Sequence, residues 1–496
     1  MMIKMNSADN NLKNKILDLM NRADFMTLST SVFSHPSAAN VYFANDGLDI
    51  YFFTFNPTRK AVQINFNPKV QIVIRPDGEE GIKELQIDGY ASKIVNPSEK
   101  EKAKEMILKV TTAFEEYMND QFLIDNDVVG YYKVSPTLIK YVDFYAEKQF
   151  EWLEIPENNF SIFSELKSKI LNSLKYWVTI IRAPFLTATV VPVILGSVIG
   201  FSETGIFNWS LFWPVLLGAS FAHIGTNTIN DYFDHLSRND ENNKLFSPFN
   251  GGSRAIQSGL ISPLSLVLFS YFCFALTIYF GCDINNKLYG DYFAASPLMY
   301  IGIAGILLGI LYTGYLRLSY NGLGDLAVFL GFGPLMVVGS NLVQNPNSDL
   351  IVSLVFSIPV GILIALVLFI NCFQDYSADK SVNKNSWVVR LAGPNPKANY
   401  RKPFKVWRIS MIIAFIIIGI SSAIFNPLAL IALLPIFLFN FANKKGLNWL
   451  LEWEKDNADL QKLPYELLIV NVSTIGIHFL TGLLLSLGFI ISSLWI

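Results

Sequence analysis

The chain has 496 residues, of which 52% are hydrophobic and 14% aromatic, and its formal net charge is −2 at pH 7. It is too long for one ordinary domain and too apolar for an ordinary soluble protein. No basic face dominates the composition, so we expect no nucleic-acid binding.

Hydrophobicity is unevenly distributed along the chain. The first part, about 160 residues long, mixes charged and apolar positions as soluble domains do, whereas the remainder holds long apolar runs separated by short polar loops. The first twenty residues lack the apolar core of a signal peptide, so we expect the N-terminal part to stay in the cytoplasm. Cys273, Cys282 and Cys372 lie in or beside apolar runs and form no CxxC pair, so neither a disulfide framework nor a zinc site is expected.

Short alternating runs fill the segment from Phe25 to Phe144, including FMTLSTSV, LDIYFFTF and KVQIVI. Asp-Gly and Asn-Pro breaks separate them, and this pattern predicts a small antiparallel barrel. The segment NPSEKEKAKEMILKVTTAFEEYM has helical spacing, so at least one helix interrupts the strands.

Two stretches of this part, Tyr51–Ile74 and Leu85–Val95, resemble the split-barrel flavin-binding family typified by pyridoxamine 5'-phosphate oxidase. The resemblance implies an FMN site and a homodimer formed through the barrel. The positions that surround FMN in the family correspond here to Thr54, Thr58, Arg59, Lys60 and Gln86. Adjacent Arg and Lys donors at a turn can hold a phosphate through charge-assisted hydrogen bonds.

Other possibilities for this barrel stay open: it binds a deazaflavin or another ligand, or it has lost its cofactor. The substrate phosphate ligands of the true oxidase are not recognisable, so vitamin B6 oxidation is not expected. We predict a split-barrel domain at 1–155, an amphipathic linker at 156–176 that lies on the membrane surface, and a transmembrane domain at 177–496.

The transmembrane domain is expected to be an all-α bundle of about nine spans. The apolar runs lie near 177–201, 208–229, 262–281, 295–314, 324–343, 350–372, 406–425, 427–442 and 466–494. Loops after even-numbered spans carry most of the Lys and Arg, whereas Lys287 is the main cation of the other loops. The positive-inside rule therefore predicts a multi-pass protein of the cytoplasmic membrane whose N-terminal domain faces the cytoplasm.

Two polar clusters follow apolar runs on this predicted cytoplasmic side. Asn227, Asp231 and Asp234 are spaced by four and three residues, and Asp375 and Asp379 are four apart. On a helix, each set shares one face. Each cluster alone would more often be a solvated helix end. Two clusters on the same side of the membrane instead favour facing carboxylates that hold Mg²⁺ together with a diphosphate.

Residues from about Lys175 onward resemble the UbiA superfamily of intramembrane prenyltransferases. The matching pieces are RAPFLTATVVPVILG, NTINDYFD, GGSRAIQSGLISP, YNGLGDLAVFLGFGP and DYSADKSVNKNSWVVRLAG. Within the superfamily the pattern is most similar to the menaquinone branch, the 1,4-dihydroxy-2-naphthoate polyprenyltransferases. The resemblance implies transfer of a polyprenyl group from polyprenyl diphosphate to an aromatic acceptor, with loss of the ring carboxylate as CO₂.

The resemblance also assigns site residues. Catalysis falls on Asp231, Asp234, Asp375 and Asp379, which with Asn227 would hold Mg²⁺, and Asp240 is a more distant acid. The diphosphate positions are Arg182, Asn230, Arg254, Lys384 and Arg390, although Arg182 and Arg390 would also fit simple membrane-edge anchors. Gln374 stands where the menaquinone branch usually has Arg, and Arg238 and Asn383 stand where Gly is usual, which weakens the assignment of the acceptor.

Three functions from different classes compete. A prenyltransferase fused to a flavin-binding barrel explains both clusters, and homogentisate, 4-hydroxybenzoate or a lipid are its other acceptors. A membrane-anchored flavin-dependent quinone reductase would need no diphosphate-binding metal. A transporter would carry its acids within the spans rather than at their ends. Tyr312, Tyr315 or phenylalanine rings could stabilise an allylic cation in the prenyltransferase.

Overall fold

The computed structural model describes residues 7–32, 35–76, 82–125, 127–155, 171, 173–243, 250–393, 399–455 and 463–494. The chain divides into two compact units, Met1–Trp177 with Ala255–Ser262, and Val178–Arg254 with Pro263–Ile496. Most of the predicted linker at 156–176 lies outside the described residues.

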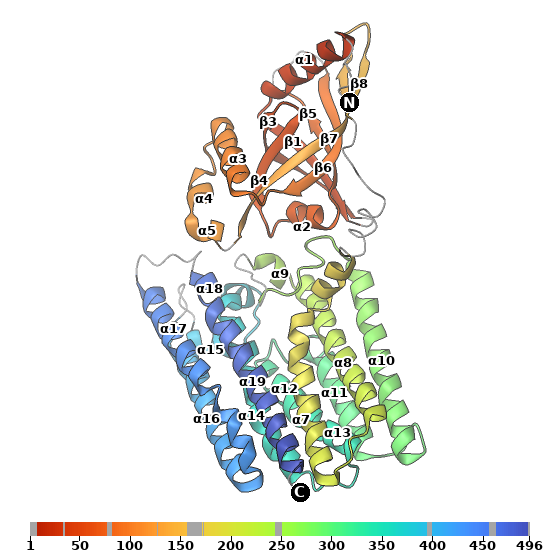
Figure 1. Cartoon of the computed structure of the whole chain (residues 1–496), viewed down its shortest axis with the longest axis vertical. Helices are drawn as coiled ribbons and strands as arrows, with labels where there is room; N and C mark the ends of the chain where they lie inside the picture. Colours follow the sequence, from red (N-terminus) through yellow and green to blue (C-terminus); the bar gives the residue numbers. More distant parts are fainter. Residues whose placement is uncertain are drawn as a thin grey trace. The chain divides into compact units, whose positions relative to one another are not determined.

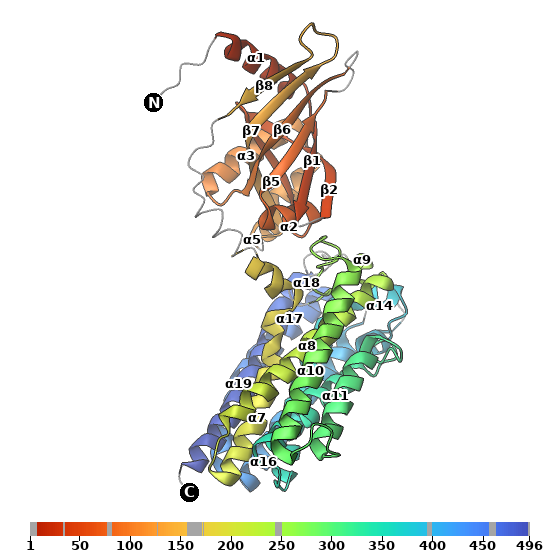
Figure 2. The same ribbon diagram turned by 90° about the vertical axis from the view of Figure 1, so that its right-hand side faces the viewer.

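The first unit is built on one antiparallel sheet, whose strands β1, β5, β6 and β7 lie side by side in Figure 2. Its elements are α1 (Ser7–Asn21), β1 (Phe25–Val32), β2 (His35–Tyr42), β3 (Ala44–Asp46), β4 (Asp49–Phe55), α2 (Arg59–Phe66), β5 (Lys69–Ile74), β6 (Lys83–Lys93), α3 (Pro97–Val110), α4 (Glu115–Asn119), α5 (Gln121–Asp125), β7 (Val129–Asp143) and β8 (Phe150–Glu154). The strand order is β2-β1-β5-β6-β7-β4-β3, and β8 pairs with β7.

Alternation of burial explains the strands, because every second residue of β1 from Met26 to Val32 is buried. The long strands β6 and β7 shift register between Asp88 and Gly89. A Cβ on Gly89 would lie 2.7 Å from the Ser135 carbonyl oxygen, so the two backbones approach there as only glycine allows. Such a bulge bends the sheet into a half-barrel.

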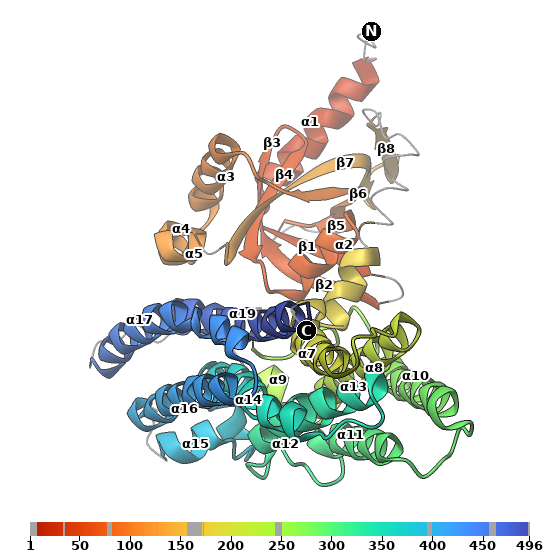
Figure 3. The same cartoon turned by 60° about the horizontal axis from the view of Figure 1, so that its bottom comes forward.

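The elements described in the second unit are helices joined by loops, and Figures 1 and 3 show its long helices running side by side. Its elements are η1 (Ala183–Leu186), α7 (Thr187–Thr204), α8 (Trp209–Leu236), α9 (Asn239–Asn242), α10 (Pro263–Tyr289), α11 (Pro297–Thr313), α12 (Gly324–Leu330), η2 (Gly331–Leu335), α13 (Met336–Gln344), α14 (Ile351–Ser381), α15 (Trp387–Ala392), α16 (Arg401–Phe425), η3 (Pro427–Leu433), α17 (Ile436–Glu454), α18 (Leu463–Glu466) and α19 (Leu468–Ser493). The mostly-β domain followed by an all-α membrane bundle is therefore confirmed.

Seven segments within the described residues are long and apolar enough to cross a membrane. They are Ala183–Thr204, Pro263–Tyr289, Gly324–Gln344, Ile351–Ser381, Arg401–Phe425, Pro427–Glu454 and Leu468–Ser493. Helices also occupy the other two expected runs, but α11 has 17 residues and α8 falls outside this set. The number of nine spans is thus not confirmed and stays a prediction.

Packing in the second unit leaves a cavity of about 450 Å³. Its lining comes mainly from α7, α8, α10 to α14 and the loop after α14. Apolar residues cover most of its wall, whereas carboxylates and amides lie at the ends of α8 and α14. The fold thus joins a polar mouth to an apolar chamber.

Candidate active site

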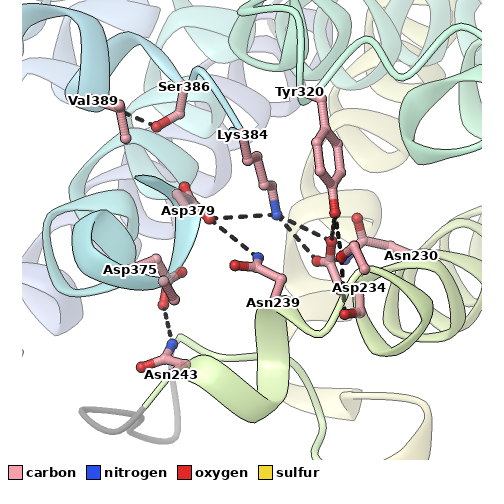
Figure 4. A network of polar contacts seen from close by, with 12 residues as sticks. Asn230, Asp234, Asn239, Asn243, Tyr320, Asp375, Asp379, Lys384, Ser386 and Val389 are labelled. Atoms are coloured by element: carbon pink, nitrogen blue, oxygen red, sulfur yellow. Dashed lines mark hydrogen bonds and ion pairs between the residues drawn. The ribbon is translucent and has the colours of Figure 1, made fainter. Parts of the chain in front are cut away.

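The two predicted acidic clusters meet at the C-terminal ends of α8 and α14 (Figure 4). Each helix carries its acids about one turn apart, because residues three or four positions apart share a face. Asp231 and Asp234 are 3% and 5% exposed, and Asp379 is 2% exposed. Carboxylates removed from water to this degree need compensating partners.

Lys384 lies between the clusters. Its Nζ is 3.1 Å from Asp234 Oδ2 and 3.7 Å from Asp379 Oδ1. Burial lowers the pKa of Lys384, but the two carboxylates raise it more, and the result is well above the ordinary value. Asn230 Nδ2 also donates to Asp234 Oδ2, at 3.0 Å. The Lys384 amine therefore forms ion pairs with one carboxylate of each cluster.

Amide side chains after α8 hold the second cluster. Asn243 Nδ2 and Asn250 Nδ2 donate to Asp375 Oδ1 at 2.6 and 2.8 Å. Asn239 Nδ2 donates to Asp379 Oδ1 at 3.2 Å. Figure 4 shows Asn239, at the start of α9, and Asn243, directly after α9, pointing toward Asp379 and Asp375 of α14. These neutral donors stabilise the carboxylates without adding charge.

Asp231 and Asp240 border the same glycine. A Cβ on Gly252, whose φ is +70°, would lie 2.9 Å from Asp240 Oδ2 and 3.0 Å from Asp231 Oδ1. Asp231 Oδ2 accepts from the Ser253 backbone N–H at 3.0 Å, whereas its buried Oδ1 has no hydrogen-bond partner among the described residues. Burial, with Asp234 and Asp231, raises the pKa of Asp240 well above its ordinary value.

The donor set suits a hard cation shared with a substrate. Among the described residues, no three His, Cys, Asp or Glu side chains come close enough to hold a metal by themselves. Mg²⁺ commonly takes one or two carboxylates and completes its octahedron with water and substrate phosphates. The unsatisfied Asp231 Oδ1 is an oxygen of the required kind. The residues present therefore fit Mg²⁺ bound together with a diphosphate.

Two predicted diphosphate residues border this mouth. Arg182 lines the cavity, and its guanidinium lies 4.6 Å from the centre of the Phe185 ring. Arg254 Nη1 donates to the backbone carbonyl of Asp240 at 2.8 Å, and burial lowers the pKa of this arginine. Arg182 therefore lies in the chamber wall, whereas Arg254 holds the short helix α9, which carries Asp240.

Arg390 is placed differently. Its Nη2 donates to the Asn321 carbonyl at 2.6 Å and its Nε to the Asn385 carbonyl at 3.0 Å. Arg390 is exposed and does not line the cavity. Its guanidinium thus connects the loop at Asn321 with the loop at Asn385. Its role toward diphosphate stays a prediction.

The three departures from the family pattern have structural explanations. Arg238 and Asn383 have φ values of 61° and 56°, the left-handed conformation in which glycine is favoured. Gln374 Oε1 faces α19, where Asn471 Nδ2 lies 3.4 Å away. Arg238 and Asn383 therefore affect backbone strain in the loops, whereas Gln374 affects packing against α19.

The chamber beyond the mouth is mainly apolar. Its aromatic lining includes Phe185, Phe280, Phe332 and Tyr312. Gly302 and Gly305 on α11 face open space within it. Asn227 and Asn230 line the cavity as well, but Tyr315 does not and is 83% exposed. Of the two tyrosines considered for cation stabilisation, Tyr312 alone lies in the chamber wall.

Sequence reasoning missed several site residues. Tyr320 Oη donates to Asp234 Oδ1 at 3.0 Å, and the tyrosine is 6% exposed. It opens the YNGLGD stretch, which belongs to the resemblance but received no predicted role. Asn239, Asn243 and Asn250 were missed because the short helix α9 and the residues after it show no periodicity. Their closeness to the first acidic cluster in sequence was the available signal.

The predicted flavin residues fall at two places in the first unit. Thr54 Oγ1 and Thr58 Oγ1 are 3.1 Å apart, and Arg59 begins α2. Burial lowers the pKa of Lys60. Neither Arg59 nor Lys60 has an ion pair among the described residues, so this helix start offers charge and backbone N–H groups to an anion.

Gln86 lies far from that turn. Thr54 pairs with Gly130 and Gln86 pairs with Lys140, so β7 separates them by ten residues. That is on the order of 30 Å along an extended strand. Gln86 Nε2 donates to Glu84 Oε1 at 2.7 Å. One copy of the chain does not bring all five residues together.

Comparison with protein families gives a match over residues 189–461 to the model described as the UbiA prenyltransferase family. A 2-carboxy-1,4-naphthoquinone phytyltransferase of Synechocystis sp. is 27% identical over 322 residues, which are 64% of this chain and 93% of the relative. A 1,4-dihydroxy-2-naphthoate octaprenyltransferase of Haemophilus influenzae is 31% identical over 230 residues, 45% of this chain and 72% of the relative.

Solved structures match another part of the chain. A Listeria innocua protein provisionally named pyridoxamine 5'-phosphate oxidase is 25% identical, with 26% of this chain and 97% of that chain covered and a TM-score of 0.23. General stress protein 26 of Bacillus anthracis is 21% identical, with 29% and 99% covered and a TM-score of 0.24. The half-barrel is recognised from the strand order of this chain itself.

Proposed function

The chain belongs to the UbiA prenyltransferase family, and we propose that it transfers a polyprenyl group from polyprenyl diphosphate to 1,4-dihydroxy-2-naphthoate with Mg²⁺, in menaquinone biosynthesis. The chain is a transferase with a multi-pass membrane part. The observation that carries the proposal is the pair of acidic clusters, joined through Lys384, at the mouth of an apolar chamber.

The diphosphate would bind at this mouth. Asp231, Asp234, Asp375 and Asp379 would hold Mg²⁺, with Asn227 beside them, and the ion supplies Lewis-acid neutralisation of the leaving diphosphate. Lys384 places a further positive charge between the clusters. A fixed cation aimed at developing negative charge lowers the barrier to departure of the diphosphate.

The chamber would protect the allylic cation that remains. Its mainly apolar lining excludes water, which would otherwise capture the cation. The ring of Tyr312 and the phenylalanine rings of the wall can face the positive charge. The chain's contribution after ionisation is therefore exclusion of water and orientation of the acceptor ring.

The naphthoate acceptor is proposed from the names of the Synechocystis and Haemophilus relatives. Homogentisate and 4-hydroxybenzoate are the competing acceptors, because the metal and diphosphate site does not distinguish among phenols. A carboxylated naphthalene would lose CO₂ on conversion to a demethylmenaquinone.

The direct test uses membranes that contain the full chain. They are incubated with 1,4-dihydroxy-2-naphthoate, radiolabelled all-trans polyprenyl diphosphate and Mg²⁺, beside an Asp375→Asn variant and an EDTA control. We expect labelled demethylmenaquinone that is absent from both controls. If a different phenol is labelled instead, that phenol is the acceptor and the naphthoate assignment is wrong. If no diphosphate is released with any acceptor, prenyl transfer is refuted.

For the first unit we propose FMN binding, with the phosphate held by Arg59 and Lys60 at the start of α2 and with Thr54 and Thr58 beside it. Completion of the site by Gln86 would need a second copy of the chain, because β7 separates it from the turn. The purified chain should show flavin absorbance that an Arg59→Ala, Lys60→Ala variant loses. Absence of flavin from correctly folded wild-type protein would refute this part alone.

We propose that the mouth of the chamber and the first unit face the cytoplasm. The support is the positive charge of loops on one side, including Arg238, Arg254, Arg317 and Lys384. Cysteine labelling in intact cells tests the orientation. A cysteine placed at Arg317 should resist impermeant reagents, and labelling there would reverse the assignment.

A further inference from the structure

Asp325 is a carboxylate of the chamber that no step above employs. It lies at the start of α12 and lines the same cavity as Asp234, Asp379 and Lys384. Its Oδ1 is buried and has no hydrogen-bond partner among the described residues. A buried polar atom without a partner destabilises the protein by roughly 1–3 kcal/mol, so its presence calls for an explanation.

The acids of the mouth differ from Asp325 in their surroundings. Asp234 and Asp379 face Lys384, and Asp375 accepts from two asparagine amides. No such bond to Asp325 Oδ1 is found in the described part of the chain. Asp325 is therefore set apart from the network that is proposed to hold Mg²⁺ and diphosphate.

The carboxylate shares the cavity wall with Tyr312 and Cys372. A Cβ on the preceding residue, Gly324, would lie 3.4 Å from Tyr312 Oη, which brings that ring close to the start of α12. Asp325 also interacts electrostatically with Tyr312 and with Cys372, both of which line the cavity. A carboxylate beside an aromatic wall is complementary to a flat phenolic ring whose hydroxyl donates to it.

We propose that Asp325 binds the ring hydroxyl of the aromatic acceptor and takes its proton during prenyl transfer. The inference rests on the proposed prenyltransferase function. As the hydroxyl loses its proton to the carboxylate, a ring carbon forms a bond with the allylic carbon. The carbon–oxygen bond of the prenyl diphosphate breaks, and its electron pair leaves with the diphosphate. The ring becomes aromatic again when the bonded carbon loses a proton or CO₂, and Asp325 returns its proton to the ring oxygen.

This role explains the position of the carboxylate. A positioned base is worth about 10²- to 10⁴-fold in rate, because it removes the proton as the bond forms. The acceptor hydroxyl also supplies the donor that Asp325 Oδ1 lacks in the described structure. The same contact rejects rings without a hydroxyl, because those would leave the buried carboxylate unpaired.

The test compares Asp325→Asn with wild type in the full-length protein. We measure Mg²⁺-dependent binding of radiolabelled polyprenyl diphosphate, and separately kcat and KM for 1,4-dihydroxy-2-naphthoate. Asp283→Asn is the matched control, because this acid forms an ion pair with Lys287 and does not line the cavity. Asp375→Asn reports loss of the diphosphate site.

In Asp325→Asn we expect kcat/KM for the acceptor to fall by about 10² or more, with diphosphate binding unchanged. Raising the pH should restore part of this loss, because the acceptor hydroxyl then ionises without a base. Unchanged kcat/KM would overturn the inference and leave the proposed function intact. Loss of diphosphate binding equal to that of Asp375→Asn would also overturn it, since Asp325 would then belong to the metal site. If the wild type itself releases no diphosphate and labels no acceptor, the proposed function is wrong and the role of Asp325 falls with it.

Discussion

Replacement of Lys384 by methionine tests the central contact of the site. The variant keeps most of the length of the side chain, lacking only the terminal amine, but leaves Asp234 and Asp379 without their shared cation. At an effective dielectric constant of about 20, a unit charge attracts carboxylates at 3.1 and 3.7 Å by about 5 and about 4.5 kcal/mol. Dehydration of the amine offsets part of this attraction, so we expect a net loss of about 3–5 kcal/mol in unfolding free energy.

Ligand binding gives a second, independent magnitude. A charge-assisted hydrogen bond to diphosphate contributes about 1.5–3 kcal/mol, so Lys384→Met should weaken binding about 10- to 150-fold. Ligand at about 100 times the wild-type dissociation constant stabilises the wild type by about 2.7 kcal/mol. The same concentration should stabilise the variant by only about 0.3 to 1.4 kcal/mol.

The assay is unfolding of the purified protein in detergent, followed by tryptophan fluorescence, with and without Mg²⁺ and a polyprenyl diphosphate. Lys380→Met serves as the control, because Lys380 Nζ contacts Tyr376 Oη at 3.1 Å and does not line the cavity. Equal stability of Lys384→Met and wild type, with equal stabilisation by ligand, would refute the bridging role of this lysine.

Three further substitutions follow from the local geometry. Arg238→Gly should raise the unfolding free energy by about 1 kcal/mol, because φ at this position is 61° and glycine adopts this conformation without strain. A lower unfolding free energy in chemical denaturation would contradict the strain argument. Gly252→Ala should lower it by about 1–3 kcal/mol and reduce transfer, because its Cβ would press on Asp240; normal transfer kinetics would refute this. Asn471→Leu should lower the unfolding free energy by about 1 kcal/mol, because Asn471 Nδ2 donates to Asn371 Oδ1 at 2.6 Å. A variant that is more stable than wild type in thermal unfolding would disprove the contribution of that bond.

Helical spacing and the charge of the loops were enough to predict that the two clusters meet. Asp231 and Asp234 share a face of α8, and Asp375 and Asp379 share a face of α14, as the spacings of three and four residues require. Lysine and arginine counts placed both helix ends on one side independently of the acids. Local periodicity and topology therefore determine which helix ends face each other.

The partners of these carboxylates could not be predicted in the same way. Asn243 and Asn250 reach Asp375 across more than a hundred residues of sequence, and loop amides have no period that would identify their target. Arg390 shows the same limit: the resemblance assigns it to diphosphate, a role that stays a prediction, and nothing in the sequence indicates that its guanidinium bonds to the Asn321 and Asn385 carbonyls. Tertiary contacts decide both cases, and a single sequence does not encode them in a readable pattern.

The count of membrane spans shows a related limit. An apolar run predicts a helix reliably, and helices occupy all nine expected runs. Helix α8 carries polar residues such as Asn227 and Asn230, which line the cavity. Helix α11, with 17 residues, is shorter than the seven segments that are long and apolar enough to cross a membrane. Hydropathy indicates how well a segment suits a lipid environment, whereas helices that line a polar site also carry the polar residues that the site needs.

The mix of donors around the acids also explains how the site can exist before substrate binds. Several carboxylates at one end of a helix bundle would repel one another if they were left alone. Lys384 neutralises charge between the clusters, while asparagine amides satisfy oxygens without adding positive charge. The described residues nevertheless supply no group of three metal-binding acids. Diphosphate oxygens would complete the coordination of Mg²⁺, so the metal and the prenyl substrate should bind more tightly together than either binds alone.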